Sequence, residues 1–203
     1  VVTKYFPKHE VQAMARAFSC SEAVHAAAYS HLSDTLGLDD FEAFLGDPTA
    51  RTKIDYFVNQ TDPVVSLGVF SGAGEGVSLF SSFAALLSFN LDGRFKGVSQ
   101  IISWSALDEQ QHSNGGCALF RQLDAEGKVS DEQKAEIVKG FEAVLENEDA
   151  FLEKIFNGYR LGCIDRDDLR DYIRYRANDR LAMLNISHRF SYNKDGADRI
   201  RQW

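Results

Sequence analysis

Two Glu-x-x-His pairs constrain this chain more than any other feature: Glu22 with His25, and Glu109 with His112, 87 residues further on. On a helix, residues three apart lie on the same face. Each pair lies in a long run whose apolar residues recur every three or four positions, so each acid and imidazole should point into the core. Burying such groups without a partner is costly, and a metal ion is the most economical partner. The chain should therefore fold into long helices that bring both pairs into one interior.

The same periodicity predicts helices along most of the chain, with almost no strand signal. We expect them at residues 7–37, 39–45, 48–57, 63–91, 94–123, 131–157 and 165–184. Residues 130–133 form a capping-box start for the helix at 131–157. Gly115-Gly116 inside the helix at 94–123 suggests close packing against a neighbouring helix. We predict an all-α bundle made by residues 1–186, followed by a polar C-terminal segment, 187–203. The alternating Asp and Arg residues of the last predicted helix are expected to form a solvated face.

The stretch 63–91 is unusual because Glu75 is its only charged residue. Its length would allow a transmembrane helix. It also carries six serines, four glycines and a carboxylate near its middle, and the rest of the chain has the composition of a water-soluble protein. We therefore interpret it as a core helix buried on nearly all sides, with Glu75 facing the same interior site as the two pairs.

Charge and cysteine content narrow the class of protein. The formal net charge of −8 argues against a nucleic-acid-binding surface. Three widely separated cysteines do not form a disulfide framework or a sulfur-rich zinc site. No basic start followed by an apolar run marks a secretory signal. These features predict a cytoplasmic protein with no nucleic-acid or membrane partner.

Tyr29 falls on the same apolar stripe as Glu22 and His25. By itself, His25 would be interpreted as a hydrogen-bonded core histidine, and Tyr29 as a packed side chain with a bonded hydroxyl. Three polar side chains directed inward together favour a functional site instead.

Dinuclear carboxylate sites in four-helix bundles use a Glu-x-x-His on each of two helices and a single acid on each of the other two. This sequence supplies both pairs and, in Glu75, one single acid. Oxygen-rich ligands with one imidazole per metal suit iron or manganese rather than zinc or cuprous copper. The pattern predicts a dinuclear metal site in the core of the bundle.

These motifs resemble a known family. Residues 18–31, Phe-Ser-Cys-Ser-Glu-Ala-Val-His-Ala-Ala-Ala-Tyr-Ser-His, are similar to a core helix of the small, radical-generating subunit of class I ribonucleotide reductase. Residues 75–79 followed by Phe83 look like its third ligand helix, and residues 108–112 match its Asp-Glu-x-x-His motif. Residues 169–175 resemble its C-terminal core helix. The resemblance implies a ferritin-like helical bundle.

The resemblance also implies roles for individual residues. Tyr29 would hold a stored radical, and Asp108 would hydrogen-bond His25 and lie on the route by which the radical leaves. The implied cofactor is two iron ions, or manganese, or one of each. The implied partners are a second copy of the chain and a large catalytic subunit that converts ribonucleotides to deoxyribonucleotides. The implied metal ligands are Glu22, His25, Glu75, Glu109 and His112.

One departure from the family concerns its first ligand, an Asp about thirty residues before the first Glu-x-x-His. That position would precede Val1, and no Asp occurs before Asp34, so we expect the helix that carries it to lie upstream of residue 1. Three alternatives stay open at this stage. They are a ferritin-like dimetal oxidase or oxygenase acting on an organic substrate, a ferroxidase-type iron-storage bundle, and a structural bundle whose Glu and His residues pair in the core.

Overall fold

The computed structural model describes residues 5–38, 46–161 and 163–202. Over these residues it is a bundle of helices, and the only β pairing among them is an isolated bridge between Leu161 and Ile164. This confirms the all-α prediction. The elements are α2 (His9–Leu36), α4 (Pro48–Val58), α5 (Pro63–Gly68), the π-helix η1 (Val69–Ser78), α6 (Leu79–Leu91), α7 (Lys96–Ala125), α8 (Asp131–Phe156), α9 (Arg166–Met183) and α10 (Lys194–Arg201).

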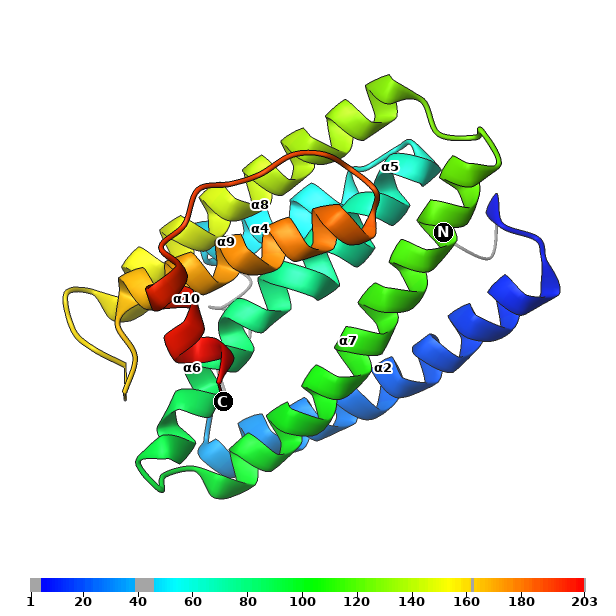
Figure 1. Ribbon diagram of the computed structural model, residues 1–203. Coiled ribbons are helices and arrows are strands. Elements are labelled where there is room, and N and C mark those ends of the chain that lie inside the picture. The colour runs from blue at the N-terminus through cyan, green and yellow to red at the C-terminus, as the bar shows by residue number, and fades with distance from the viewer. Residues whose placement is uncertain (1–4, 39–45, 162, 203) are drawn as a thin grey trace.

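The segment α5–η1–α6 forms the centre of the bundle, with α7 on one side and α8 and α9 on the other, while α2 lies along α7 at the edge (Figure 1). Helix α2 ends at Gly37, whose φ of 65° is the left-handed conformation that glycine adopts readily. The short helix expected at residues 39–45 lies outside the described residues.

The central segment was predicted as one ordinary helix, and the structure shows that its middle third is a π-helix. It begins at Asp62, whose carboxylate accepts hydrogen bonds from the N–H groups of Val64 and Val65 at 2.8 and 3.0 Å. Its glycines allow close packing: a Cβ on Gly72 would lie 2.7 Å from the Phe141 ring. The segment Pro63–Leu91 is long and apolar enough to cross a membrane, and 72% of its most apolar window is buried within this fold.

Helix α7 carries the second Glu-x-x-His on its buried face. Ile102, Glu109, His112 and Phe120 are all buried, as the sequence pattern predicted. The Gly115-Gly116 pair was expected to mark close packing against a neighbour. This is confirmed, because a Cβ on Gly116 would overlap the Ser71 side chain of η1.

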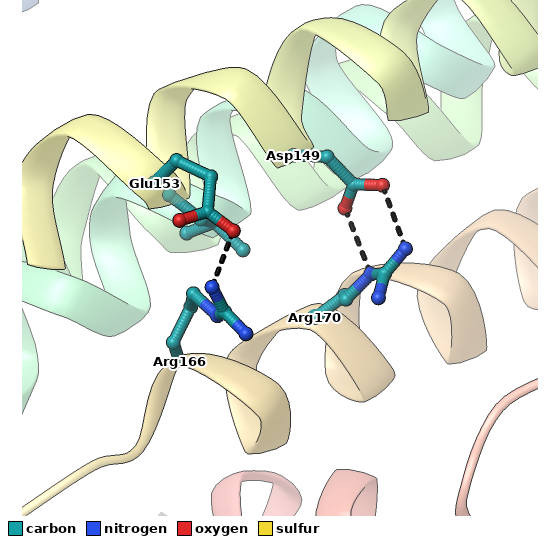
Figure 2. A pocket seen from close by; sticks show the side chains of 5 residues that line it. Asp149, Glu153, Arg166 and Arg170 are labelled. Atoms are coloured by element: carbon teal, nitrogen blue, oxygen red, sulfur yellow. Dashed lines mark hydrogen bonds and ion pairs between the residues drawn. The ribbon is translucent and has the colours of Figure 1, made fainter. Parts of the chain in front are cut away.

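Helices α8 and α9 pack together through apolar faces and a row of ion pairs. The predicted capping box of α8 is present, with Ser130 and Gln133 each bonding the backbone of the other. On the outer edge, Asp149 binds Arg170 through two contacts of 3.2 Å, and Glu153 pairs with Arg166 (Figure 2). These side chains line a cavity of about 90 Å³ that includes none of the predicted ligands.

In the C-terminal part of the chain, the expectation of a solvated Asp and Arg face on α9 is wrong at Arg180. Arg180, on the supposedly solvated face of α9, is only 5% exposed, because α9 turns this face toward η1 and α7. The polar segment 187–203 contains α10, which packs on α9 and buries Ala197 and Ile200. With only two buried apolar residues, a helix this short leaves little periodic signal in the sequence. The boundary drawn at residue 186 stays a prediction.

Candidate metal centre

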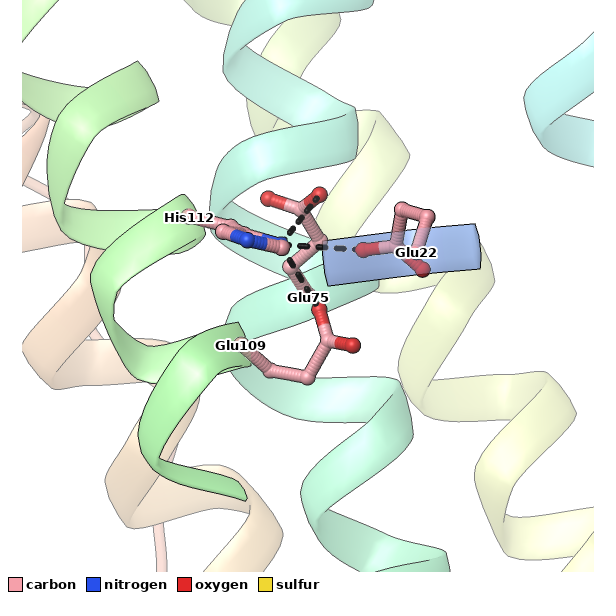
Figure 3. Close-up of side chains that lie close together, drawn as sticks. All are labelled: Glu22, Glu75, Glu109 and His112. Atoms are coloured by element: carbon pink, nitrogen blue, oxygen red, sulfur yellow. Dashed lines mark ion pairs between the residues drawn. The ribbon is translucent and has the colours of Figure 1, made fainter. Parts of the chain in front are cut away.

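Three elements bring four of the predicted ligands together. Glu22 comes from α2, Glu75 from η1, and Glu109 and His112 from α7 (Figure 3). One donor atom from each lies within 4.8 Å of the others. The i, i+3 spacing on α7 accounts for the last two, while the approach of Glu22 and Glu75 depends on how the helices pack.

The four residues differ in burial. Glu109 and His112 are 5% and 3% exposed, and the Glu75 side chain is 12% exposed. The Glu22 side chain reaches His112, with Oε1 3.0 Å from Nδ1, but it is 52% exposed. Glu22 therefore points toward the other ligands, as expected, but its side chain is not enclosed. Helix α2 packs chiefly against α7, so one side of Glu22 is left open by the described residues.

His25 lies beside this group and is linked to it through Glu109. Its Nδ1 atom is 3.0 Å from Glu109 Oε1, while Glu109 Oε2 is 3.3 Å from His112 Nδ1. Glu22 also approaches both imidazoles. Its Oε1 atom is 3.0 Å from His112 Nδ1, and its Oε2 atom is 3.7 Å from His25 Nδ1. Two carboxylates therefore each span both imidazoles, whose ring centroids are 6.4 Å apart.

Asp108 fixes the tautomer of His25. Its Oδ2 atom lies 3.1 Å from His25 Nε2. A carboxylate only accepts hydrogen bonds. His25 Nδ1 lies 3.0 Å from Glu109 Oε1 but makes no hydrogen bond among the described residues, so the proton of the neutral ring is assigned to Nε2. The lone pair of His25 is then on Nδ1, which faces the carboxylates.

Ser21 fixes the tautomer of His112. The contact between these two residues was not predicted from the sequence. The Ser21 hydroxyl donates its one proton to the Phe18 carbonyl at 2.9 Å. It must therefore accept from His112 Nε2, which is 2.9 Å away. This puts the lone pair of His112 on Nδ1 as well. The only available signal was the position of Ser21 directly before Glu22.

The two inward nitrogens fit a metal site. Both Nδ1 atoms are buried and have no hydrogen-bond partner in the described residues. Burial raises the pKa of Glu75 to about 9, and the carboxylates of Glu109 and Glu22 add to this effect. Burial and Glu22 also raise the pKa of Glu109 to about 7. Bound cations would offset the repulsion among these carboxylates. A donor set of carboxylates with one imidazole per metal suits iron or manganese.

Tyr29 lies one helical turn beyond His25, with ring centroids 6.4 Å apart. Its hydroxyl oxygen is buried. Burial raises the pKa of Tyr29, against the opposing effect of the Ser105 hydroxyl of α7. The phenol is therefore kept neutral, with its oxygen shielded from solvent, close to the cluster.

Comparison with known proteins decides the family. A model of the family described as "Ribonucleotide reductase, small chain" matches residues 1–195. The chain belongs to this family of ribonucleotide reductase small chains. The resemblance drawn from the motifs is confirmed, and the family is one of oxidoreductases.

Individual relatives agree. The chain is 30% identical to the probable ribonucleoside-diphosphate reductase small subunit of Invertebrate iridescent virus 6, over 92% of this chain and 64% of the relative. It is 26% identical to the ribonucleoside-diphosphate reductase subunit beta of Chlamydia pneumoniae, over 81% of this chain and 54% of the relative. The chain thus spans less than two thirds of the length of these small subunits.

The fold agrees too. A crystal structure of a putative class I ribonucleotide reductase from Bacillus halodurans superposes with a TM-score of 0.75 at 20% identity, covering 90% of this chain and 71% of that one. At this identity the likeness shows the fold alone. It confirms the ferritin-like helical bundle predicted from the sequence.

Proposed function

We propose that this small chain generates and stores a tyrosyl radical for ribonucleoside-diphosphate reduction. The observation that carries the proposal is the pair of imidazoles, His25 and His112. Each is oriented from outside so that its Nδ1 lone pair meets the shared carboxylates, with the Tyr29 phenol beside them.

Two iron ions, two manganese ions or one of each would supply oxygen activation when bound. The residues of the chain itself hold and orient the metal ligands. Each histidine offers one nitrogen and is held in place through the other, which keeps the donor set preorganised. We propose as metal ligands Glu22, His25, Glu75, Glu109 and His112.

Tyr29 would be the one-electron donor of the site. Its oxidation would pass one electron to the metal-loaded centre and release the phenolic proton toward the nearby carboxylates of Glu109 and Glu22. Burial of the phenol oxygen would shield the resulting radical from water. The side chain of Asp108 is 44% exposed while its carboxylate is bonded to His25. It therefore joins the interior to the surface, as a relay toward a large catalytic subunit would require.

The remaining parts of the proposal concern assembly and location. We infer that the protein works in the cytoplasm as a homodimer and passes the oxidising equivalent to the large subunit, which reduces the nucleotide. The names of the relatives, which are small subunits or subunit beta of this reductase, support the proposal of a large-subunit partner.

Replacing Tyr29 with Phe tests the assignment of the radical. The metal-reconstituted chain should show a tyrosyl signal in electron paramagnetic resonance, and Tyr29→Phe should abolish it with metal content unchanged. Tyr56→Phe is the matched control, because Tyr56 is also partly buried and has a pKa raised by burial. A tyrosyl signal that survives Tyr29→Phe would refute the assignment.

A further inference from the structure

Helix α9 supplies none of the proposed ligands, yet one of its arginines reaches the residues directly after two of them. Arg176 Nε donates to the carbonyl of Gly76 at 2.7 Å, and its Nη2 donates to Gln110 Oε1 at 3.0 Å. Gly76 follows Glu75 on η1, and Gln110 follows Glu109 on α7. One guanidinium therefore joins the two helices immediately behind two carboxylates of the cluster.

A second arginine, Arg180, contacts the two residues that directly follow His112 on α7. It is 5% exposed, and its Nη1 donates to Asn114 Oδ1 at 2.9 Å and to Ser113 Oγ at 3.3 Å. Gly76 makes room for it, because a Cβ on that residue would lie 2.5 Å from Arg180 Cδ. The two arginines thus contact the residues that directly follow Glu75, Glu109 and His112.

The geometry of Arg176 is that of a rigid clamp. Its guanidinium carbon lies 3.4 Å from the ring centroid of Phe80 on α6, so the planar group is held by stacking as well as by its hydrogen bonds. Gly76 also belongs to the π-helical segment, and the contact fixes the backbone of that segment one residue after Glu75. A lysine has a single ammonium group and cannot reproduce this forked contact.

We propose that Arg176 and Arg180 are positioning residues for the metal centre: they set the distance between the carboxylates of η1 and α7 by holding the residues behind them. This inference rests on the proposed metal site. Arg174, a partly buried neighbour on α9, does not share this role. Among the described residues its hydrogen bonds go to Asp149 of α8, at 2.6 Å, and to the Arg170 carbonyl, neither of which is next to a ligand. Arg174 shares Asp149 with Arg170 on the edge seen in Figure 2.

The test compares Arg176→Met with Arg174→Met in the full 203-residue chain, freed of metal and titrated with Mn²⁺. Bound manganese is followed by electron paramagnetic resonance, and unfolding by urea. We expect both variants to lose stability, and only Arg176→Met to bind Mn²⁺ roughly tenfold more weakly or worse, with an altered spectrum. Arg176→Lys should fold, keep the charge and give an intermediate affinity with a similarly altered spectrum.

The outcomes separate this inference from the proposed function. If the unaltered chain binds no Mn²⁺ at the cluster, the proposed function fails. If the unaltered chain binds it, and Arg176→Met keeps the same affinity and spectrum or changes them no more than Arg174→Met does, the positioning role alone is overturned. If Arg176→Met does not fold, an Arg176→Lys spectrum identical to that of the unaltered chain overturns the role equally.

Discussion

At the scale of single residues, the centre depends on which ring nitrogen each histidine presents. His112 can offer Nδ1 only while Nε2 keeps its proton, and Ser21 secures this by accepting that hydrogen bond. His25 is oriented in the same way by Asp108. One orienting group is a hydroxyl and the other a carboxylate.

Ser21→Ala should weaken metal binding without affecting the fold, because it removes the group that orients His112. We expect a loss in Mn²⁺ affinity of roughly tenfold, measured by calorimetric titration. Ser19→Ala is the control: Ser19 lies on the same helix, and its hydroxyl donates to the Ala15 carbonyl on the exposed side. Equal affinities for the two variants would show that Ser21 does not orient the ligand.

At the scale of elements, the position of Glu75 depends on how closely η1 approaches its neighbours. Small residues permit this contact, with Gly116 of α7 facing Ser71 of η1 and Gly72 facing Phe141 of α8. A π-helical segment is a less common backbone form that is often found at functional sites. Here it is enclosed by α7, α8 and α9, whose packing fixes the direction of the Glu75 side chain.

Gly116→Ala should destabilise the protein, because the added methyl group would overlap Ser71. Overpacking of this kind costs about 1–3 kcal/mol, measured as a lower free energy of unfolding in urea. Gly97→Ala on the same helix serves as the control, since a Cβ there meets no atom within 4 Å. It should be neutral or stabilise by up to about 1 kcal/mol. Gly116→Ala with undiminished stability would contradict the packing argument.

At the scale of the whole molecule, α2 is the least buried long helix, although it carries two proposed ligands and Tyr29. His25 is its only buried residue, whereas α8 buries Ile137, Phe141 and Leu152 among others. Local stability follows such differences in buried contacts. The proposed metal site would therefore tie the weakest long helix to the centre of the bundle.

Hydrogen exchange should detect this difference. In the metal-free chain, the backbone amides of α2 should exchange through openings of lower free energy than those of α8. Mn²⁺ at about 100 times its Kd should stabilise α2 against opening by about 2.7 kcal/mol, because Glu22 and His25 would bind the ion together with Glu109. Uniform protection of α2 and α8 without metal would show that the chain opens only as one unit.

The sequence by itself determined the features that depend on local spacing. The i, i+3 pairs put Glu109 beside His112, the capping box placed the start of α8, and the lone charge of the 63–91 stretch singled out Glu75. Family motifs added the pairing of Asp108 with His25, which the geometry matches. The metal ligation itself stays a proposal.

Only the tertiary structure decided the contacts between residues far apart in the chain. Ser21 and His112 are 91 positions apart, and Arg176 and Gly76 are 100 positions apart. The Arg residues of α9 have the sequence pattern of a solvated face, and α10 has too few apolar residues to predict a helix. A side chain's burial depends on which helix packs over it, and that choice is made by the sum of many apolar contacts across the bundle rather than by any local run of residues.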